Sequence, residues 1–367
     1  MRNTKAMPCQ WKDKVFNISD DGFEKLALEL FLFQYENNTI YHQYVNVLQV
    51  QVDKVQSLTQ IPFLPIRFFK THPVKTTSFD TATIFESSGT TGSVNSRHFI
   101  KDMELYKESF TKGFEFSYGP VEDWCIIGLL PSYLERQNSS LVYMVNELIK
   151  QSGNNNSGFY LHEYEQLFNL LKVLEKKKQK TLLIGVTFAL LDFAETYSSH
   201  FYKGFFNYTI IMETGGMKGR RKEMIRQEVH DILKTSFDVS LIHSEYGMTE
   251  LLSQAYSNGN GIFKCPPWMK VLVREEEDPL SMPYFSRMTM AEDDSKSMAY
   301  VDSKSTAYFD IKSMAYAGAI NIIDLANVYS CSFIATDDAG KVFSDGSFEV
   351  LGRIDNSDLR GCSLMVL

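Results

Sequence analysis

The sequence predicts an α/β protein that continues into a β-rich segment. Three short apolar runs, Trp124–Pro131, Thr181–Val186 and Tyr208–Gly216, are bounded by turn residues and are typical of buried strands. Amphipathic helical patterns lie between these runs, and such alternation indicates a sheet covered by helices. After about Gly259 the helical periodicity fades, and strand-like stretches separated by turns follow.

The composition is that of a globular protein. Of the 367 residues 44% are hydrophobic and 22% are charged, enough for one large domain with a smaller subdomain. A formal net charge of −8 gives no general attraction to nucleic acid or to an anionic membrane. No apolar run reaches the length of a signal peptide or a membrane span. We therefore expect a cytoplasmic protein with no nucleic-acid partner and no membrane span.

The cysteines favour the same location. They are odd in number and have no paired spacing of the kind that metal sites use, which fits a reducing compartment. The five are Cys9, Cys125, Cys265, Cys331 and Cys362.

The N-terminal part predicts a helix and an apolar connector. From Ser19, a capping serine and acidic residues precede apolar residues at helical spacing, which indicates an amphipathic helix. The stretch from Ile61 to Lys70 is unusually apolar, and Pro62 and Pro65 favour an extended backbone. We expect this stretch to be a buried connector or part of an acyl-binding wall.

A loop rich in serine, threonine and glycine follows. Glycine leaves backbone N–H groups free to point inward, and short hydroxyls reach phosphate oxygens, so the loop predicts a nucleotide site. It lacks the Gly-Lys-Ser/Thr ending of a P-loop, which disfavours an ordinary NTPase. The alternative is a polar surface loop. Its residues are Ser87, Ser88, Gly89, Thr90, Thr91 and Gly92.

A second polar motif, Y-G-M-T-E, spans residues 246–250. Tyr246 could stack on a base, Thr249 could bond a phosphate, and Glu250 could hold the Mg²⁺ that bridges phosphate oxygens. The alternative is a strand-to-helix turn with Glu250 in the first helical turn.

Together the two motifs, about 150 residues apart, resemble the adenylate-forming superfamily of acyl- and aryl-CoA ligases, peptide-synthetase adenylation domains and luciferases. The stretch Gly352 to Gly361 resembles the hinge motif of that superfamily, with asparagine and aspartate where an acid and a lysine are usual. The phosphate loop of the superfamily usually ends in lysine, whereas this loop continues to Arg97, which leaves open whether Arg97 reaches phosphate.

The resemblance implies that ATP and Mg²⁺ are used. Thr249 and Glu250 match catalytic positions, with Glu250 the metal ligand, and Asp338 matches the aspartate that binds the ribose hydroxyls. His243 would polarise the acyl carboxylate or cap the turn before Glu245. The implied nucleotide-binding residues are Ser87, Ser88, Gly89, Thr90, Thr91, Gly92, Gly215, Gly216, Tyr246, Gly247, Asp338 and Arg353.

Over nearly its whole length the chain resembles the LuxE-type acyl-protein synthetase of the bacterial bioluminescence fatty-acid reductase complex. Only six residues follow Gly361, so the small C-terminal domain usual in adenylate-forming enzymes is expected to be missing. In the LuxE-type family a cysteine near the C-terminus accepts the acyl group as a thioester, and Cys362 matches it. The alternative for Cys362, and our expectation for the other four cysteines, is an inert thiol.

We expect three parts along the chain: an α/β adenylating body at 1–258, a β-rich subdomain at 259–350, and a hinge motif with an acyl-acceptor tail at 351–367. Three near-copies of eight residues, S-K-S-M-A-Y-V-D, S-K-S-T-A-Y-F-D and I-K-S-M-A-Y-A-G, form an insertion at 295–318. Their alternation predicts extended strands or an exposed hairpin arm, and the simplest interpretation is a duplication that lengthens a surface loop.

The implied function is ATP-dependent activation of a long-chain fatty acid as acyl-AMP, followed by transfer to Cys362 and delivery to a partner reductase. This would make the protein a ligase that forms carbon–sulfur bonds. Adenylation turns a poorly electrophilic carboxylate into an anhydride that a thiol can attack. One alternative is a ligase that uses coenzyme A or a carrier-protein thiol. Another is a non-catalytic scaffold subunit that binds nucleotide or acyl-adenylate, although retention of Thr249, Glu250 and Asp338 argues against it.

Overall fold

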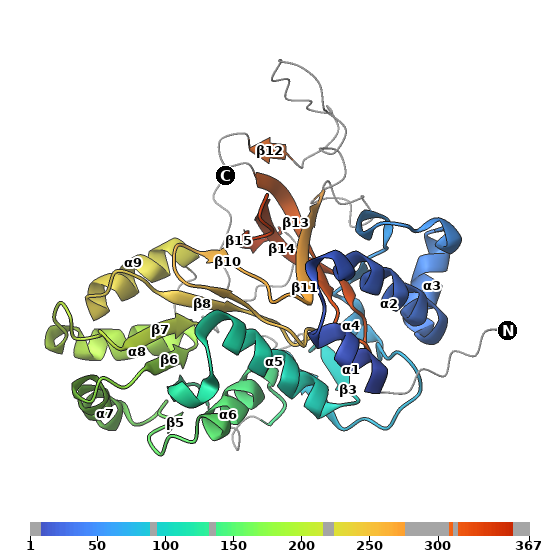
Figure 1. Ribbon diagram of the computed structural model, residues 1–367. Helices are drawn as coiled ribbons and strands as arrows, with labels where there is room; N and C mark the ends of the chain where they lie inside the picture. Colours follow the sequence, from blue (N-terminus) through green and yellow to red (C-terminus); the bar gives the residue numbers. More distant parts are fainter. Residues whose placement is uncertain are drawn as a thin grey trace.

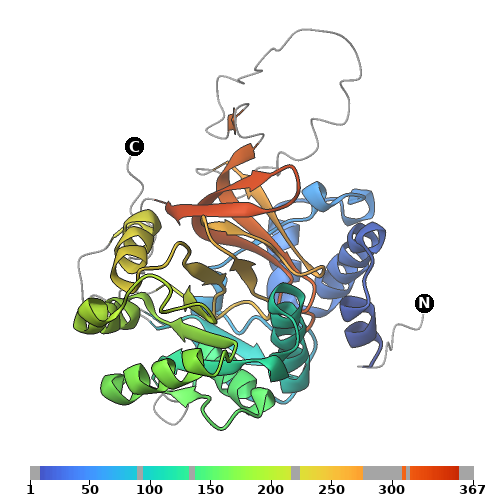
Figure 2. The ribbon, with the colours of Figure 1, turned by 60° about the vertical axis from the view of Figure 1, so that its left-hand side comes forward.

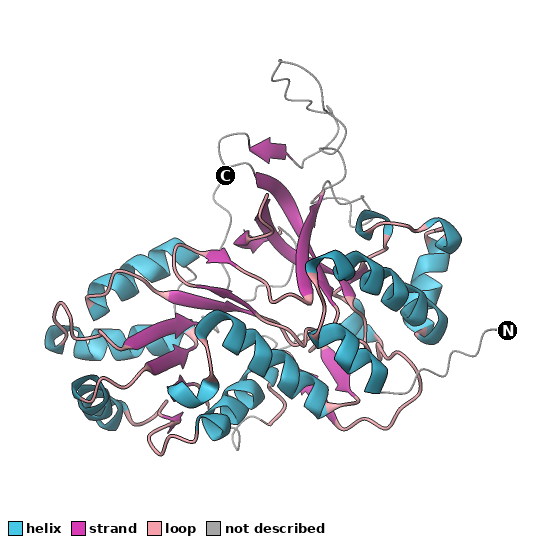
Figure 3. Ribbon diagram, in the orientation of Figure 1, coloured by secondary structure: helices cyan, strands magenta, loops and turns pink. Residues whose placement is uncertain are grey.

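Two large sheets organise the protein, as the computed structural model shows (Figure 1 and Figure 3). The structure describes residues 9–88, 94–131, 137–215, 224–275, 308–310 and 315–354. The first sheet is mainly parallel and is surrounded by helices, and the second is mainly antiparallel. The protein therefore has the mixed α/β architecture that the sequence predicts.

The first sheet has the strand order β5-β4-β6-β7-β8-β9, parallel throughout except for the antiparallel pair β8 and β9. Every residue of β4 and β6 is buried, which explains their uninterrupted apolar sequence. The three predicted strands are confirmed as β4, β6 and β7. The bounds are β4 Cys125–Leu129, β5 Gly158–Phe159, β6 Thr181–Gly185, β7 Thr209–Glu213, β8 His243–Tyr246 and β9 Ala255–Ser257.

Helices surround this sheet (Figure 1). The α7 helix buries Leu167, Leu171 and Leu174, a stripe at helical spacing that faces the core. The α6 helix begins with a side-chain cap from Ser139 and ends at Gly153, whose φ of 59° is left-handed. The bounds are α5 Met103–Tyr118, α6 Ser140–Ser152, α7 Tyr164–Lys176, α8 Thr187–Tyr197 and α9 Arg226–Phe237.

The second sheet has the order β10-β15-β14-β13-β11, and β1 and β12 add to β14 and β13. It lies next to the α/β part of the molecule (Figure 2). The strands are β1 Leu64–Pro65, β10 Ile262–Phe263, β11 Met269–Arg274, β12 Tyr308–Asp310, β13 Ala315–Asp324, β14 Phe333–Phe343 and β15 Phe348–Arg353.

The eight-residue repeats are partly described. Residues 308–310 pair antiparallel with the start of β13, where Phe309 lies opposite Tyr316. The predicted extended conformation is confirmed for these residues. The rest of the repeats, 295–307 and 311–314, lies outside the described residues.

The N-terminal helices differ from the prediction in one detail. The expected capping by Ser19 is wrong, because a 3-10 turn at Asp20–Gly22 intervenes and the α2 helix begins at Phe23 without a side-chain cap. Ser19 instead accepts a hydrogen bond from the Gly22 N–H through its backbone carbonyl, at 2.9 Å. The helices are α1 Cys9–Phe16, α2 Phe23–Asn37, α3 Thr39–Val47 and α4 Phe68–Thr71.

The apolar connector is extended at its first residue, Ile61, and at β1, and it becomes helical towards its end. Leu64 and Pro65 form β1 and pair with β14, whereas the backbone becomes helical from Phe68. Proline restricts its own φ and the residue before it, so a helix can begin a few residues later. Further 3-10 turns lie at Val52–Lys54, Leu58–Gln60, Val121–Asp123 and Ser198–His200. Within the described ranges, no helix has the length and apolar character to cross a bilayer.

Candidate active site

A cavity opens at the carboxyl ends of the parallel strands. Val186 follows β6, Gly215 follows β7, and Tyr246 ends β8, and all three line it. The second sheet closes the opposite side with Asp338 from β14 and Arg353 from β15. The carboxyl edge of a parallel sheet is where ligands bind in open α/β folds.

Many predicted site residues meet in this cavity although they are far apart in sequence. Eight of them line it: Ser87, Ser88, Gly215, Tyr246, Gly247, Thr249, Asp338 and Arg353. His243 and Glu250 are described but do not line it. The remaining predicted residues lie outside the described residues: Gly89, Thr90, Thr91, Gly92, Gly216 and Cys362.

The predicted phosphate loop lies in the sequence between β2 (Thr83–Glu86) and β3 (Arg97–Ile100), which pair antiparallel, and the structure describes Ser87 and Ser88 of the loop. At its base the Ser87 N–H donates to the Ser96 carbonyl at 3.1 Å, and the Ser96 N–H donates to the Ser87 hydroxyl at 2.9 Å. Ser87 is buried, whereas Ser88 is exposed in the cavity. The exposed Arg97 guanidinium lies over the Phe99 ring, with 5.7 Å between its carbon and the ring centroid.

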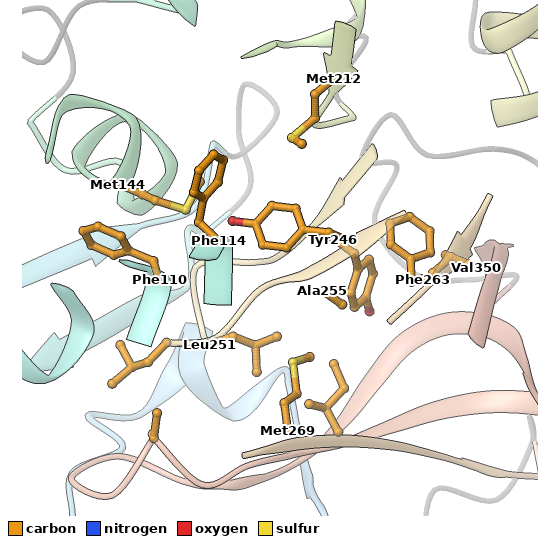
Figure 4. Packing of buried hydrophobic residues seen from close by; sticks show 14 of the residues in the cluster. Phe110, Phe114, Met144, Met212, Tyr246, Leu251, Ala255, Phe263, Met269 and Val350 are labelled. Carbon is orange, nitrogen blue, oxygen red and sulfur yellow. The ribbon is translucent and has the colours of Figure 1, made fainter. Parts of the chain in front are cut away.

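Tyr246 connects the two sheets. Its hydroxyl donates to Asp338 Oδ2 at 2.8 Å, and Arg353 Nε lies 3.5 Å from Asp338 Oδ1. The Tyr246 ring packs at centroid distances of 5.8 Å from Phe263 and 5.4 Å from Phe348. Figure 4 shows Tyr246 and Phe263 side by side in this packing. The ring therefore belongs to the core, and its hydroxyl orients Asp338.

Asp337, a cavity residue that sequence reasoning missed, anchors the start of the hinge motif. Its Oδ2 lies 3.3 Å from Arg67 Nε and 3.8 Å from an Arg353 guanidinium nitrogen. Its backbone carbonyl accepts a 3.0 Å hydrogen bond from the Ile354 N–H. The Arg67 side chain is mostly exposed, so its ion pair contributes little to stability.

The turn that carries Thr249 and Glu250 is held by two buried side chains from elsewhere. His98 Nδ1 donates to the Thr249 carbonyl at 2.8 Å, and the Asn327 amide donates to the Glu250 carbonyl at 2.8 Å. Burial lowers the pKa of His98 to about 4, although its hydrogen bonds to the Thr249 carbonyl and to Asn327 raise the pKa. Neither His98 nor Asn327 carries a local sequence signal, because both contacts join distant segments.

Glu250 itself is fully buried. Neither of its carboxylate oxygens has a hydrogen-bond partner in the part of the chain that the structure describes. A buried carboxylate requires a compensating cation or proton, because desolvation of an isolated charge is costly. This donor is therefore of the type that binds Mg²⁺.

Glu213, at the end of β7, is a buried carboxylate with several partners. It accepts from the Gly215 N–H at 2.7 Å, and Arg226 Nε and His230 Nε2 lie at 3.3 and 3.5 Å. Burial, the largest influence, raises its pKa, but the His230 hydrogen bond and the Arg226 charge outweigh it and bring the pKa to about 2. Glu213 is therefore ionised near neutral pH.

Glu245, on the neighbouring strand β8, has a raised pKa, whereas that of Glu213 is lowered. It lines the cavity and is 8% exposed. Burial and then the charge of Glu213 raise its pKa to about 8. Neutral pH therefore leaves most of the Glu245 carboxyl protonated.

His243 begins β8 on the side of α5. Its Nδ1 lies 3.2 Å from the Tyr118 hydroxyl, and burial lowers its pKa to about 4. Because it does not line the cavity, its role toward an acyl carboxylate stays a prediction.

The chain was compared with protein families, with curated protein sequences and with solved structures. The family described as "Acyl-protein synthetase, LuxE" matches residues 6–367. No curated protein sequence matches the chain.

The solved structures that match include a CoA ligase. A 2-hydroxyisobutyryl-CoA ligase, solved in an open conformation with 2-HIB-AMP and CoA, has a TM-score of 0.61 at 10% identity over 98% of this chain and 83% of its own. The same ligase in its thioesterification state gives a TM-score of 0.61 at 12% identity over 98% and 75%. These matches show the fold.

ATP-bound MatB from Rhodopseudomonas palustris matches at a TM-score of 0.49 and 14% identity over 75% of this chain. The match covers 48% of MatB, so this chain spans about half the length of that relative.

Proposed function

Because this chain belongs to the LuxE acyl-protein synthetase family, we propose that it activates a long-chain fatty acid with ATP and transfers the acyl group to Cys362 as a thioester. The observation that carries the proposal is the convergence of the distant motifs on one cavity, where Ser88, Thr249, Asp338 and Arg353 meet.

The chemistry has two steps. A carboxylate oxygen of the acid attacks the α-phosphorus of ATP, a carbon–oxygen–phosphorus link forms, and pyrophosphate leaves. The thiolate of Cys362 then attacks the acyl carbonyl carbon, a carbon–sulfur bond forms, and AMP leaves with the bonding electron pair.

The residues that line the cavity suggest how ATP would be bound. Asp338, oriented by Tyr246, would accept hydrogen bonds from the ribose hydroxyls, and the Thr214–Gly215 turn would border the adenine. Ser88 and Thr249 would donate to phosphate oxygens. Arg353 would offer positive charge beside Asp338.

Glu250 is buried behind Thr249 and does not line the cavity, but its carboxylate oxygens have no hydrogen-bond partner in the described residues, so it is the proposed Mg²⁺ ligand provided that it turns towards the phosphates when ATP binds. Among the residues that the structure describes, no cluster of three His, Cys, Asp or Glu could hold a metal by itself. Glu250 would thus share the ion with phosphate oxygens and water. When bound, the ion supplies charge neutralisation at the phosphates during displacement of pyrophosphate.

Three other cysteines, Cys125, Cys265 and Cys331, are poor nucleophiles, which supports Cys362 as the acceptor. Burial raises the pKa of Cys125 to about 11 and that of Cys331 to about 12, and it also raises the pKa of Cys265. The thiolate is the reactive form, so these thiols are inert near neutral pH. From the acylated Cys362 the acyl group would pass to a partner reductase.

The test is self-acylation. The protein is incubated with radiolabelled myristate, Mg²⁺ and ATP without coenzyme A, and label that hydroxylamine removes is counted on wild type, Cys362→Ser and the control Cys9→Ser. We expect ATP-dependent label on wild type and Cys9→Ser and none on Cys362→Ser. Label on Cys362→Ser would move the acceptor elsewhere, and pyrophosphate exchange without label would indicate an external thiol. Absence of both would leave a non-catalytic subunit.

A further inference from the structure

The Glu245 carboxyl is a buried acid that no described side chain satisfies. It lines the cavity one residue before Tyr246, and within the described chain it makes no hydrogen bond or ion pair. A buried carboxyl in this situation holds its proton, because the neutral form is cheaper to desolvate. Its O–H is then a donor that faces the cavity.

Among the residues that the structure describes, the charge with a marked effect on Glu245 is the negative one of Glu213. Glu213 on β7 is ionised and repels a second negative charge, while Tyr106 on α5 and Tyr256 on β9 are neutral phenols. Arg226 at the start of α9 pairs with Glu213, with 3.3 Å between Arg226 Nε and Glu213 Oε1. Burial, and then the charge of Glu213, therefore favour the protonated Glu245 carboxyl.

The position of the carboxyl is set by Gly247. A Cβ at residue 247 would collide with Glu245 Oε1 and lie 3.3 Å from Gln254 Cγ. Glycine thus leaves the space that the Glu245 carboxyl fills, directly against the turn that leads to Thr249. The apolar side chains of Leu141 and Met144 and the Tyr106 ring line the same cavity.

Two further polar groups beside Glu245 lack partners. Gln254 Oε1 and the Tyr256 hydroxyl are buried and have no hydrogen-bond partner in the described residues. Gln254 also lines the cavity. Unsatisfied buried polar groups at the wall of a cavity are commonly completed by a ligand.

We propose that the neutral Glu245 carboxyl is a positioning residue for the acid substrate and donates its hydrogen bond to one oxygen of the substrate carboxylate. The other carboxylate oxygen is thereby free to attack the α-phosphorus. After pyrophosphate leaves, the same bond goes to the acyl carbonyl oxygen of acyl-AMP, and Glu245 keeps its proton throughout. This inference rests on the proposed function and specifies which group recognises the acid.

The test is the pH dependence of the KM for the acid in ATP–pyrophosphate exchange. In wild type we expect this KM to rise above pH 8, by about tenfold per unit once Glu245 is ionised, with the KM for ATP unchanged. Glu245→Gln keeps a donor of the same size and cannot ionise, so its KM should lack this rise. Comparing the two proteins removes the titration of the acid itself. Glu245→Leu should raise the KM about tenfold at pH 7.

Binding of labelled myristate in equilibrium dialysis without ATP, together with the melting temperature, separates this inference from the proposed function. If wild type shows no pyrophosphate exchange, the proposed function is overturned. If Glu245→Leu nevertheless binds myristate more weakly than wild type and Glu245→Gln do, the role of Glu245 in recognising the acid is supported. Unchanged binding and KM in Glu245→Leu, with only a lower melting temperature, would make Glu245 a structural group and overturn the inference. A pH-dependent rise retained in Glu245→Gln would overturn it as well.

Discussion

The Tyr246 hydroxyl donates a 2.8 Å hydrogen bond to Asp338 Oδ2, across 92 residues of sequence. Tyr246 is the last residue of β8 in the mainly parallel sheet, and Asp338 lies in β14 of the mainly antiparallel sheet. The bond therefore couples the two sheets at the cavity in which we place the nucleotide.

Replacing Tyr246 with phenylalanine tests this coupling. The Phe263 and Phe348 contacts remain, and only the hydrogen bond is lost, at a cost of about 1 kcal/mol. We expect the KM for ATP to rise about fivefold while the KM for the acid stays constant, measured by pyrophosphate exchange. An equal rise in both KM values would indicate a general loss of structure.

The Glu250→Gln variant removes the negative charge of the side chain and keeps its size, so it tests the proposed role of Glu250 as a metal ligand. Because the Glu250 oxygens are buried without partners, the neutral amide should leave the melting temperature unchanged or higher. The loss of a metal ligand should lower kcat of exchange about 100-fold and raise the Mg²⁺ concentration for half-maximal rate. A matched Glu228→Gln control, on the exposed side of α9, should keep full activity. Full activity of Glu250→Gln at low Mg²⁺ would contradict the assignment.

Gly247→Ala is expected to act through Glu245. The added Cβ collides with Glu245 Oε1 and displaces the carboxyl, so the KM for the acid should rise in the single variant. In Gly247→Ala combined with Glu245→Leu the two effects should be less than additive, because the group that the methyl displaces is already gone. The check is a double-mutant cycle on the KM values. Full additivity would show that Gly247→Ala acts elsewhere.

Mild acid should destabilise the fold through His98. Its pKa is about 4 when folded and about 6.5 when unfolded, so the unfolded chain binds more protons between these values. The free energy of unfolding should therefore fall as the pH decreases from 6.5 to 4, by up to about 3 kcal/mol for this residue.

Urea titrations at pH 7 and pH 5 measure this loss. His98→Gln, which retains a donor for the Thr249 carbonyl, should be less stable at pH 7 and should lose less stability on acidification. His243, whose pKa is also about 4, contributes in the same direction, so His243→Gln is the matched comparison. An unchanged pH dependence in His98→Gln would show that His98 does not control it.

Local patterns along the chain were enough to predict some of the strands and motifs of this protein. Buried parallel strands require continuous apolar sequence, so β4, β6 and β7 were predictable. Glycine, hydroxyl and carboxylate groups suit phosphate, so the loop and turn motifs predicted a nucleotide site, and adenylate-forming chemistry followed from their resemblance to a known family. The start of α2 was missed, since Ser19 has the chemistry of a cap but a 3-10 turn intervenes.

What the sequence by itself determined was three strands of the parallel sheet, the β-rich character of the later part, the motifs and the family, because each depends on residues close together in the chain. Only the tertiary structure decided that Tyr246 belongs to the core and bonds Asp338, and that His98 supports Thr249. It also decided that burial, and then the charge of Glu213, raise the pKa of Glu245. These relationships depend on which strands become neighbours and how water is excluded between them. Burial and the distance between charges set hydrogen bonding and protonation, and neither is encoded in a local pattern of residues.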